Sequence, residues 1–533
     1  MGKSKKKMGE KEDRTRINAS TGCAQNDASV GYAQIVILGA GASGLAAAIA
    51  AGASPDSHPD VLVIDGNDKV GKKLYATGNG RCNFTNAYCS SEDYNQPEDG
   101  FVDTVFDVFS PEDTLNFFRG CGMMARLEDG GRYYPYSGQA ASLVDILKRE
   151  AERRGCRFLL SDKAVQATLI GRDDAELGGK GRSRSAAWRF SIELKSGRKV
   201  LCSRLVIACG GRAGLKTGST GDGYGFAKAF GHTLAAPRPA LTAVESDDVF
   251  LADLKGVRSK GGVSLYRDGA KLAEESGEIQ FTGSGVSGIC VFNLTRHMEA
   301  ARPAGHNRKT EQQAALYEIR CDFVPELRHS QLAELLSAQL AGAEAQDIQD
   351  IQKALETALI GIVNDKLAKV IARLSMQSCG RKAPERDGVS NHSGVGSQVT
   401  ELEKEPGKTV QSRSRKTPDS APKRPDSVWG NSDGVPKESD ISPEKKAAHL
   451  LKELKVSISH TKGWNDAQVT CGGVRREEIE PRSMESKLVE GLYFCGEVVD
   501  VDGRCGGFNL QWAWSSGAAA GKSAGRAAEC GRK

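Results

Sequence analysis

Residues 34–65 constrain the fold of this chain more than any other stretch. The stretch begins with a short apolar run, Ile35–Leu38, as expected of a strand that is buried on both faces of a parallel sheet. Glycines then occupy positions 39, 41 and 44 in G-x-G-x-x-G spacing, and an alanine-rich helical segment follows. A second apolar run, Val61–Ile64, ends at Asp65. This order of strand, glycine turn, helix, strand and acid predicts a βαβ unit that binds a dinucleotide.

Each conspicuous residue of this unit has its own physical role. Gly39 permits the tight turn out of the strand, and Gly41 lacks a Cβ, so a pyrophosphate can approach the backbone. Gly44 lets the helix and the strand pack closely. The helix N-terminus presents free N–H groups to the phosphates, and Asp65 accepts hydrogen bonds from a ribose. The alternative, a glycine turn without a ligand, does not explain the flanking strands and the acid.

The loop directly after the acid is rich in glycine and short polar residues, as suits a segment wrapped round a ligand. It covers residues 66–86, and Lys72 and Lys73 could neutralise a pyrophosphate there. An ordinary charged surface loop is the alternative, and residue chemistry alone leaves both open. Cys82 of this loop is either a proton donor near the cofactor or a small packing residue.

Two internal strands are expected to lead back to the same site. Residues 205–208 form an apolar strand that precedes Cys209, Gly210 and Gly211, and such a turn returns the backbone to the crevice at the carboxyl edge of a sheet. The alternative is a plain strand-to-helix turn. Residues 164–169 form another expected strand, on which Val165 is placed near the adenine end of a ligand.

A second glycine-lined helix start lies near the C-terminus. An apolar strand at 492–494 leads to Gly496 and Glu497, and glycines 506 and 507 precede a helix expected to begin near Asn509. In flavoproteins such a terminus faces the flavin pyrimidine, where its dipole stabilises negative charge on the reduced ring. Glu497 is then expected near the phosphate–ribityl linkage. The alternative is a capped surface helix with two tryptophans in the core.

The rest of the chain divides by composition. Strand-like runs separated by glycines predict a β-rich insert from residue 237, and helical stripes follow over 324–374. Residues 1–30 form a basic tail and residues 375–442 a polar linker, and both are expected to be disordered. A nucleic-acid-binding arm is the alternative for the tail. Three smaller predictions are a helical segment over 101–118, a tyrosine-rich turn over 130–137 and a hairpin loop over 171–185.

Composition excludes several classes of protein. The net charge of +5 is too small to demand a polyanionic partner, and the 14 cysteines lack C-x-x-C pairs, which indicates reduced thiols and a cytoplasmic location. The eight histidines show no ligand spacing, so we expect no metal site. No apolar run of roughly 18 residues is present, and the N-terminus lacks the apolar region of a secretory signal.

Four longer motifs resemble one known family. They are TGNGRCNFTN (77–86), GSTGDGYGFAKAFGH (218–232), AQVTCGGV (467–474) and MESKLVEGLYFCGEVVDVDGRCGGFNLQWAWSSG (484–517). Together they are similar to the HI0933-like flavoproteins, also called the BaiN/RdsA family of NAD(P)/FAD-dependent oxidoreductases, some of which are labelled aminoacetone oxidases. The resemblance covers residues 34 to about 374 and 445 to 525. In this chain Asp65 stands where a glutamate is usual, and Cys209 and Cys505 replace smaller or hydroxyl residues.

The resemblance implies an α/β fold. A Rossmann-like, glutathione-reductase-type FAD-binding domain, 31–236 and 461–533, is interrupted by a β-rich and helical insert on the substrate side, 237–374 and 443–460. Combined with the motifs above, it places the following residues around FAD: Gly39, Gly41, Ala42, Ser43, Gly44, Asp65, Gly66, Lys72, Lys73, Asn79, Gly80, Arg81, Cys82, Asn83, Val165, Cys209, Gly210, Gly496, Glu497, Gly507, Phe508, Asn509 and Leu510.

The expected function is that of an FAD-dependent oxidoreductase that passes a hydride from NADH or NADPH to a small organic acceptor such as an activated C=C bond. Only one complete G-x-G-x-x-G unit is evident, so the nicotinamide donor is expected to dock transiently. Two alternatives are an amine oxidase of the aminoacetone type that uses oxygen and, on the strength of the lysine-rich tail, an RNA-associated flavoprotein. We expect a small-molecule substrate rather than a membrane or a nucleic acid. The sequence identifies neither a catalytic acid or base nor the oligomeric state.

Overall fold

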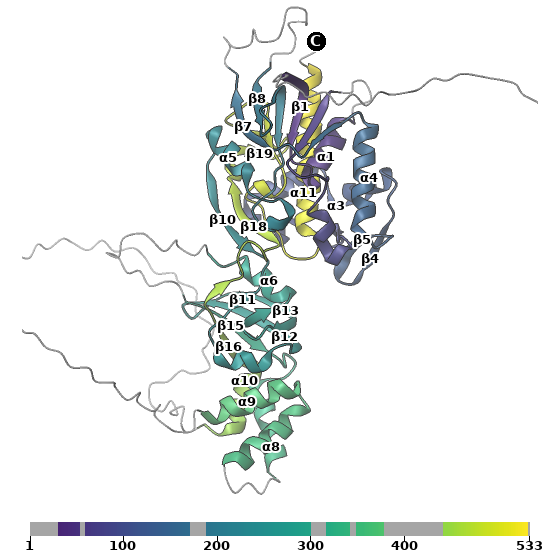
Figure 1. The fold of residues 1–533 in the computed structure, drawn as a ribbon. Coiled ribbons are helices and arrows are strands. Elements are labelled where there is room, and N and C mark those ends of the chain that lie inside the picture. The colour runs from purple at the N-terminus through teal and green to yellow at the C-terminus, as the bar shows by residue number, and fades with distance from the viewer. Residues whose placement is uncertain are drawn as a thin grey trace, which may run out of the picture. The chain divides into compact units, whose positions relative to one another are not determined.

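The computed structural model describes residues 30–53, 59–170, 188–299, 316–341, 348–377 and 441–530. Apart from a few flanking residues, the tail 1–30, the linker 375–442 and the hairpin loop 171–185 lie outside these ranges. The chain forms two units (Figure 1). Unit 1 comprises residues 1–244, 291–312 and 460–533, and unit 2 comprises residues 245–290 and 313–459. Unit 2 begins at residue 245 rather than at the predicted 237, and it excludes residues 291–312 of the predicted insert.

A nine-stranded sheet forms the centre of unit 1. Its main path runs in the order β19 (Ile479–Glu480), β20 (Glu485–Ser486), β21 (Leu492–Phe494), β9 (Lys199–Ile207), β1 (Val30–Leu38), β2 (Val61–Asp65) and β6 (Arg157–Leu160). The strands from β21 to β6 are parallel, with Ile37 of β1 between Val63 and Val206. The apolar side chains of β21, β1 and β2 are buried on both faces, which explains why these strands read as continuous hydrophobic runs, whereas those of the edge strand β6 are partly buried. The branch β7 (Ala164–Leu169) and β8 (Phe190–Leu194) pairs antiparallel with β9.

Two smaller antiparallel sheets complete the strands of unit 1. One contains β3 (Thr85–Asn86), β5 (Arg132–Pro135) and β4 (Ala125–Glu128), and the other pairs β10 (Leu234–Ala240) with β18 (Val469–Val474). The prediction of a turn over 130–137 is wrong at its centre, because residues 132–135 form β5. Tyr133 packs its ring against Phe84, with 6.4 Å between centroids, and this contact favours a strand where the local glycines suggested a turn.

Seven helices of the described chain contribute to unit 1: α1 (Ala42–Ala51), α2 (Phe101–Val108), α3 (Pro111–Gly120), α4 (Ala140–Arg153), α5 (Asp222–Ala229), the last residues of α6 (Ile289–Thr295) and α11 (Phe508–Cys530). The single helical segment predicted over 101–118 is two helices. Ser110 separates them because its Oγ accepts a hydrogen bond from the Asp113 amide at 3.0 Å, and Pro111 follows at the first helical position.

Helices α1 and α11 lie side by side through a row of glycines (Figure 1). A Cβ on Gly517 would lie 2.4 Å from the Ser43 carbonyl oxygen, and one on Gly521 would lie 2.2 Å from that of Ala47. Gly525 repeats the approach one turn later. The four-residue spacing keeps these glycines on one face of α11. The C-terminal helix is thus held against the helix of the first dinucleotide motif.

Unit 2 combines an antiparallel sheet with helices. Its strands are β12 (Arg258–Arg267), β13 (Ala270–Phe281), β14 (Gly285–Ser287), β15 (Tyr317–Asp322) and β16 (Leu454–Ile458), and its helices are α7 (His329–Leu340), α8 (Ile348–Ile360), α9 (Asp365–Gln377) and α10 (Pro443–Glu453). The short strands β11 (Val244–Glu245) and β17 (His460–Thr461) occur where the chain first enters and last leaves this unit. The predicted order of strands followed by helices is confirmed. None of the described helices is long and apolar enough to cross a bilayer.

Candidate cofactor site

The first glycine motif forms a turn with one open position. Gly39 has φ +108°, and a Cβ there would lie 2.4 Å from the Ala208 carbonyl oxygen. A Cβ on Gly44 would lie 1.9 Å from the Gly39 carbonyl oxygen, so both positions exclude any other residue. At Gly41, by contrast, an added Cβ meets no atom of the described residues within 4 Å. Open space beside Gly41 is what the close approach of a pyrophosphate requires.

The N-terminus of α1 has no side-chain cap. Gly41 is the N-cap residue, and half-buried Ala42 begins the helix. Ser43 does not cap it, because its Oγ faces the end of β21, where it lies 3.4 Å from the Cys495 carbonyl oxygen. Gly496 has φ +76°, and a Cβ on it would lie 2.4 Å from that hydroxyl. The first-turn N–H groups therefore remain available to an anion, as the dinucleotide hypothesis requires.

Asp65 is oriented by the turns around it. Its Oδ2 accepts a hydrogen bond from the Ala40 amide at 2.7 Å, and its Oδ1 accepts two from Asn67, at 2.7 and 2.9 Å. A carboxylate offers about four lone-pair positions, so one remains for a ribose hydroxyl. Exposed Gly66 lies against Lys163, and Asn67 lies against Gly218, where a Cβ would be 2.5 Å from its amide nitrogen. The turn after β9 thus reaches the tip of β2.

Lys73 and Glu497, 424 residues apart, form an ion pair of 2.7 Å. The other Glu497 oxygen accepts a hydrogen bond from the Thr470 amide at 2.8 Å, and the Thr470 hydroxyl accepts one from the Arg212 amide at 2.8 Å. A Cβ on Gly211 would lie 2.3 Å from that hydroxyl. The 66–86 loop, the turn after β9, strand β18 and the residues after β21 therefore meet at one point.

Two neighbours of these residues take a smaller part. Lys72 is exposed to solvent. Cys209 is half-buried with its Sγ 3.4 Å from the Leu38 carbonyl oxygen, and burial raises the pKa of its thiol. Gly210 has φ +72°, which no other residue adopts readily, and so it supplies the turn. The turn therefore lies beside the end of β1, at the carboxyl edge of the parallel sheet.

The segment 78–82 has an unusual backbone. Gly78, Asn79, Gly80 and Cys82 all have positive φ, between +54° and +83°. A positive φ is sterically unfavourable for Asn79 and Cys82, and backbone strain of this kind concentrates at functional sites. Cys82 is fully buried, and burial raises the pKa of its thiol to about 11. A side chain without exposed surface favours the packing role of Cys82 over the role of proton donor.

The start of α11 is held against the 83–86 segment. Gly507 has φ +100°, and a Cβ there would lie 2.6 Å from the Thr85 carbonyl oxygen and 2.9 Å from Asn83 Oδ1. Asn83 donates through Nδ2 to the carbonyl oxygens of Thr85 and Tyr133, both at 3.1 Å. Its buried Oδ1 has no hydrogen-bond partner among the described residues. An unsatisfied buried acceptor costs about 1–3 kcal/mol, which a donor on a bound ligand would relieve.

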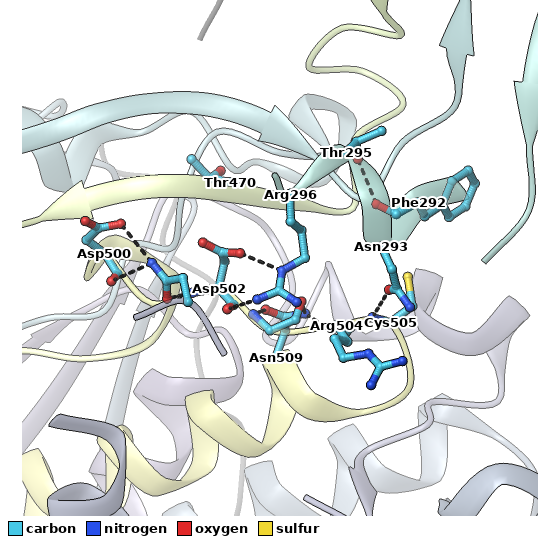
Figure 2. A network of polar contacts seen from close by, with 12 residues as sticks. Phe292, Asn293, Thr295, Arg296, Thr470, Asp500, Asp502, Arg504, Cys505 and Asn509 are labelled. Carbon is cyan, nitrogen blue, oxygen red and sulfur yellow. Dashed lines mark hydrogen bonds and ion pairs between the residues drawn. The ribbon is translucent and has the colours of Figure 1, made fainter. Parts of the chain in front are cut away.

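The loop before α11 depends on residues that the sequence did not indicate. Arg296 donates from Nε to Asp502 Oδ1 at 2.7 Å and from Nη2 to the Asp502 carbonyl oxygen at 2.8 Å (Figure 2). Asn293 Oδ1 accepts a hydrogen bond from the Cys505 amide at 2.9 Å. The Asn509 amide group, expected at the flavin, is engaged with Gly503 through two bonds of 2.8 Å and so stabilises the loop.

Residues 94 and 95 also hold the loop before α11. Asn95 Oδ1 accepts a hydrogen bond from the Asp502 amide at 3.1 Å, and the Tyr94 hydroxyl donates to the Phe508 carbonyl oxygen at 2.7 Å. Phe508 is buried, and half-buried Leu510 packs against the core. In the sequence, the only sign of these contacts is a polar residue after each turn of the chain. Such residues are too common to indicate specific contacts.

No contact joins Val165 to these residues among those that the structure describes. It is 52% exposed on β7, in the antiparallel branch of the sheet. Most of the other predicted residues lie at the turn around Gly41, at the Lys73–Glu497 pair or at the start of α11, whereas Arg81 pairs with Glu128 of β4. No group of three or more potential metal ligands is present in the described ranges.

The parallel sheet, the open turn at Gly41 and the glycine-lined start of α11 define a dinucleotide-binding protein of the Rossmann type. A family model described as "HI0933-like protein Rossmann domain" matches residues 33–523. The chain therefore belongs to the HI0933-like family, as the sequence motifs predicted. The predicted α/β class with a Rossmann-like domain is confirmed, and separate antiparallel sheets accompany the parallel one.

Two characterised relatives match nearly the whole chain. A "3-dehydro-bile acid delta(4,6)-reductase" of Clostridium scindens is 32% identical over 491 residues, which cover 92% of this chain and 98% of the relative. A "Ribosomal RNA dihydrouridine synthase" of Haemophilus influenzae is 26% identical over 493 residues, 91% of this chain and 96% of the relative. Among solved structures, a 3-ketosteroid-delta4-(5alpha)-dehydrogenase of Rhodococcus jostii aligns with a TM-score of 0.41 at 14% identity, covering 95% of this chain and 99% of that one. The protein is an FAD-dependent oxidoreductase.

Proposed function

We propose that this enzyme takes a hydride from NADH or NADPH and delivers it to an activated carbon–carbon double bond of a small organic acceptor. One observation carries the proposal. The two relatives matched over more than nine-tenths of their length are both named for the saturation of such a bond, in a bile acid and in a uridine. The substrates differ in size and class, so the shared feature is the bond that is reduced.

The residues present fit FAD. The turn at Gly41 would take the pyrophosphate, Asp65 the ribose, and the start of α11 the flavin ring, beside the unpaired acceptor of Asn83. When bound, FAD supplies hydride transfer between donor and acceptor. Within the chain, the dipole of α11 favours negative charge at its N-terminus, and the Lys73–Glu497 pair orients the segment expected at the ribityl chain.

The overall reaction balances in electrons and protons. The nicotinamide donor loses a hydride and is oxidised, one carbon of the acceptor gains that hydride, and the neighbouring carbon gains a proton. The cysteines in the described part of the chain are all free thiols, which agrees with a reducing cytoplasm as the proposed location.

The proposal is tested by anaerobic titration of the yellow holoenzyme with NADH and with NADPH. Bleaching of the flavin absorbance by either one, followed by its return on addition of an α,β-unsaturated ketone, is the expected result. The product should carry two more hydrogens than the ketone. If neither nicotinamide bleaches the flavin, the donor is wrong. Peroxide production with aminoacetone in air would instead support an amine oxidase, and reduction of a uridine in RNA would move the acceptor from a small molecule to a nucleic acid.

A further inference from the structure

The three-stranded sheet β3–β5–β4 has two unlike faces. Tyr133 of β5 directs its ring at buried Phe84, so this face is turned toward the core at β5, whereas its partner Leu127 on β4 is 55% exposed. The neighbouring pairs, Arg126 with Tyr134 and Glu128 with Arg132, alternate onto the opposite face. Arg81 and Tyr136 contact the same side. We refer to these six residues as the arginine–tyrosine face: Arg81, Arg126, Glu128, Arg132, Tyr134 and Tyr136.

Guanidinium groups stack on tyrosine rings across this face. The Arg81 Cζ lies 4.2 Å from the centroid of the Tyr134 ring, and the Arg126 Cζ lies 4.3 Å from that of Tyr136. Both distances are within the range of cation–π attraction. Tyr136 is nevertheless 56% exposed, so its ring retains surface for a further planar group.

The positive charge of the face is only partly neutralised. Glu128 pairs with Arg81, whose hydrogen bond lowers the pKa of this carboxyl, and the nearby charge of Arg126 lowers it further. In the ranges that the structure describes, no carboxylate lies within ion-pair distance of Arg126 or Arg132. Two arginines on adjacent strands are therefore left to bind an anion, and their planar forks match the oxygens of a phosphate.

The arginine–tyrosine face continues directly from the candidate cofactor site. A Cβ on Gly78 would lie 3.5 Å from Cε1 of Tyr134, so that ring packs on the strained turn over 78–82. Arg81 belongs to this turn and to the face at once.

We propose that the arginine–tyrosine face binds the adenosine end of the nicotinamide donor, with the adenine on Tyr136 and a 2′-phosphate between Arg126 and Arg132. The inference rests on the proposed function, because it assigns the docking place of that donor and predicts a preference for NADPH over NADH. A nucleic-acid strand is the less suitable occupant. Such strands are held through roughly 6–10 phosphate contacts, whereas this face offers two unpaired arginines with Glu128 beside them.

The first experiment measures binding of 2′,5′-ADP, the adenosine bisphosphate fragment of NADPH, to the holoenzyme by calorimetry. Arg126→Ala and Arg132→Ala are each expected to weaken binding by about tenfold or more, because each removes a charge-assisted contact. 5′-AMP, which lacks the 2′-phosphate, should bind weakly to all variants. Arg119→Ala is the matched control, since Arg119 is an exposed arginine of α3 that donates to Asn116. Equal binding of 2′,5′-ADP by wild type and both face variants would overturn the inference.

The second experiment measures flavin reduction by NADPH and by NADH in the same variants. The expected result is a rise of about tenfold in the apparent Kd for NADPH, with an unchanged limiting rate and an unchanged Kd for NADH. If neither nicotinamide reduces the wild-type flavin, the proposed function fails. The 2′,5′-ADP measurement still shows whether the arginine–tyrosine face binds the adenosine bisphosphate. Tight binding of a single-stranded RNA oligonucleotide that depends on Arg126, without binding of 2′,5′-ADP, would overturn the inference in favour of a nucleic acid.

Discussion

Arg296 and Asp502 are 206 residues apart in the chain, yet their side chains form an ion pair of 2.7 Å that is almost completely buried. The arginine comes directly after α6, and the aspartate lies in the loop that precedes α11. Because Arg296 also donates to the Asp502 carbonyl oxygen, it fixes the backbone of that loop as well as its charge. The position of the glycines at the start of α11 therefore depends on a residue from a distant part of the sequence (Figure 2).

Removal of this arginine should be costly. Arg296→Ala leaves a carboxylate buried without its partner, for which we expect a loss of about 3–5 kcal/mol in the free energy of unfolding. Urea denaturation measures it, and FAD affinity should fall in the same variant. The control is Arg504→Ala, because Arg504 belongs to the same loop but is half-buried, and its 3.7 Å ion pair with Asp93 should contribute less than about 1 kcal/mol. Equal losses in both variants would show that the buried pair has no special role.

The glycine row of α11 gives a second prediction. Gly521→Ala places a methyl group 2.2 Å from a backbone oxygen of α1, so the two helices must separate. Overpacking of this kind costs about 1–3 kcal/mol, and we expect a lower melting temperature together with weaker FAD binding. Gly225→Ala in α5 is the matched control, since a Cβ there meets no described atom within 4 Å. It should be neutral or stabilising by up to about 1 kcal/mol, because alanine favours helix. An unchanged melting temperature and unchanged FAD binding in Gly521→Ala would disprove the close contact.

His232 provides a prediction about pH. Its ring is buried between Glu478 and Ser486, at 2.9 and 2.7 Å, and burial lowers the pKa of the imidazole below its ordinary value of 6.5 despite the carboxylate. Between the two pKa values the unfolded chain binds more protons than the folded chain, so stability is complete above pH 6.5 and declines as the pH falls below it. Depression of the Glu478 pKa acts in the same direction at lower pH.

The measurement is the free energy of unfolding between pH 5 and pH 8, in wild type and His232→Gln. In the variant, the free energy of unfolding should fall less steeply as the pH drops below 6.5. His449→Gln is a necessary comparison, because burial also lowers the pKa of His449 in unit 2. A slope that disappears only in His449→Gln would assign the effect to unit 2 and contradict the role of His232.

The sequence predicted best where chemistry and structure are local. The strand, turn and helix around Gly41 follow from spacing within residues 34–65, and all three elements are present. The start of α11 was predicted within one residue from its glycine pair. By contrast, Gly130 and Gly131 suggested a turn over 130–137, and the strand β5 depends on pairing with β4 and β3, which the local pattern does not show.

Residues that act over long sequence distances were missed. Nothing near Arg296 indicates that its partner is Asp502, because a buried ion pair has no local signature. The glycines at 517, 521 and 525 did carry a signal, since their four-residue spacing on a helix indicates close packing. The partner helix could be named only from the fold.

The central claim is that the open turn at Gly41 receives the pyrophosphate of FAD. Titration of FAD into wild type and Gly41→Ala, followed by flavin fluorescence, tests it most directly, because the structure has room for this methyl group but a bound pyrophosphate would not. We predict that both apoproteins melt at the same temperature, and that the variant binds FAD at least about tenfold more weakly. Equal FAD affinity in the two proteins, or a folded wild type that takes up no FAD, would contradict it.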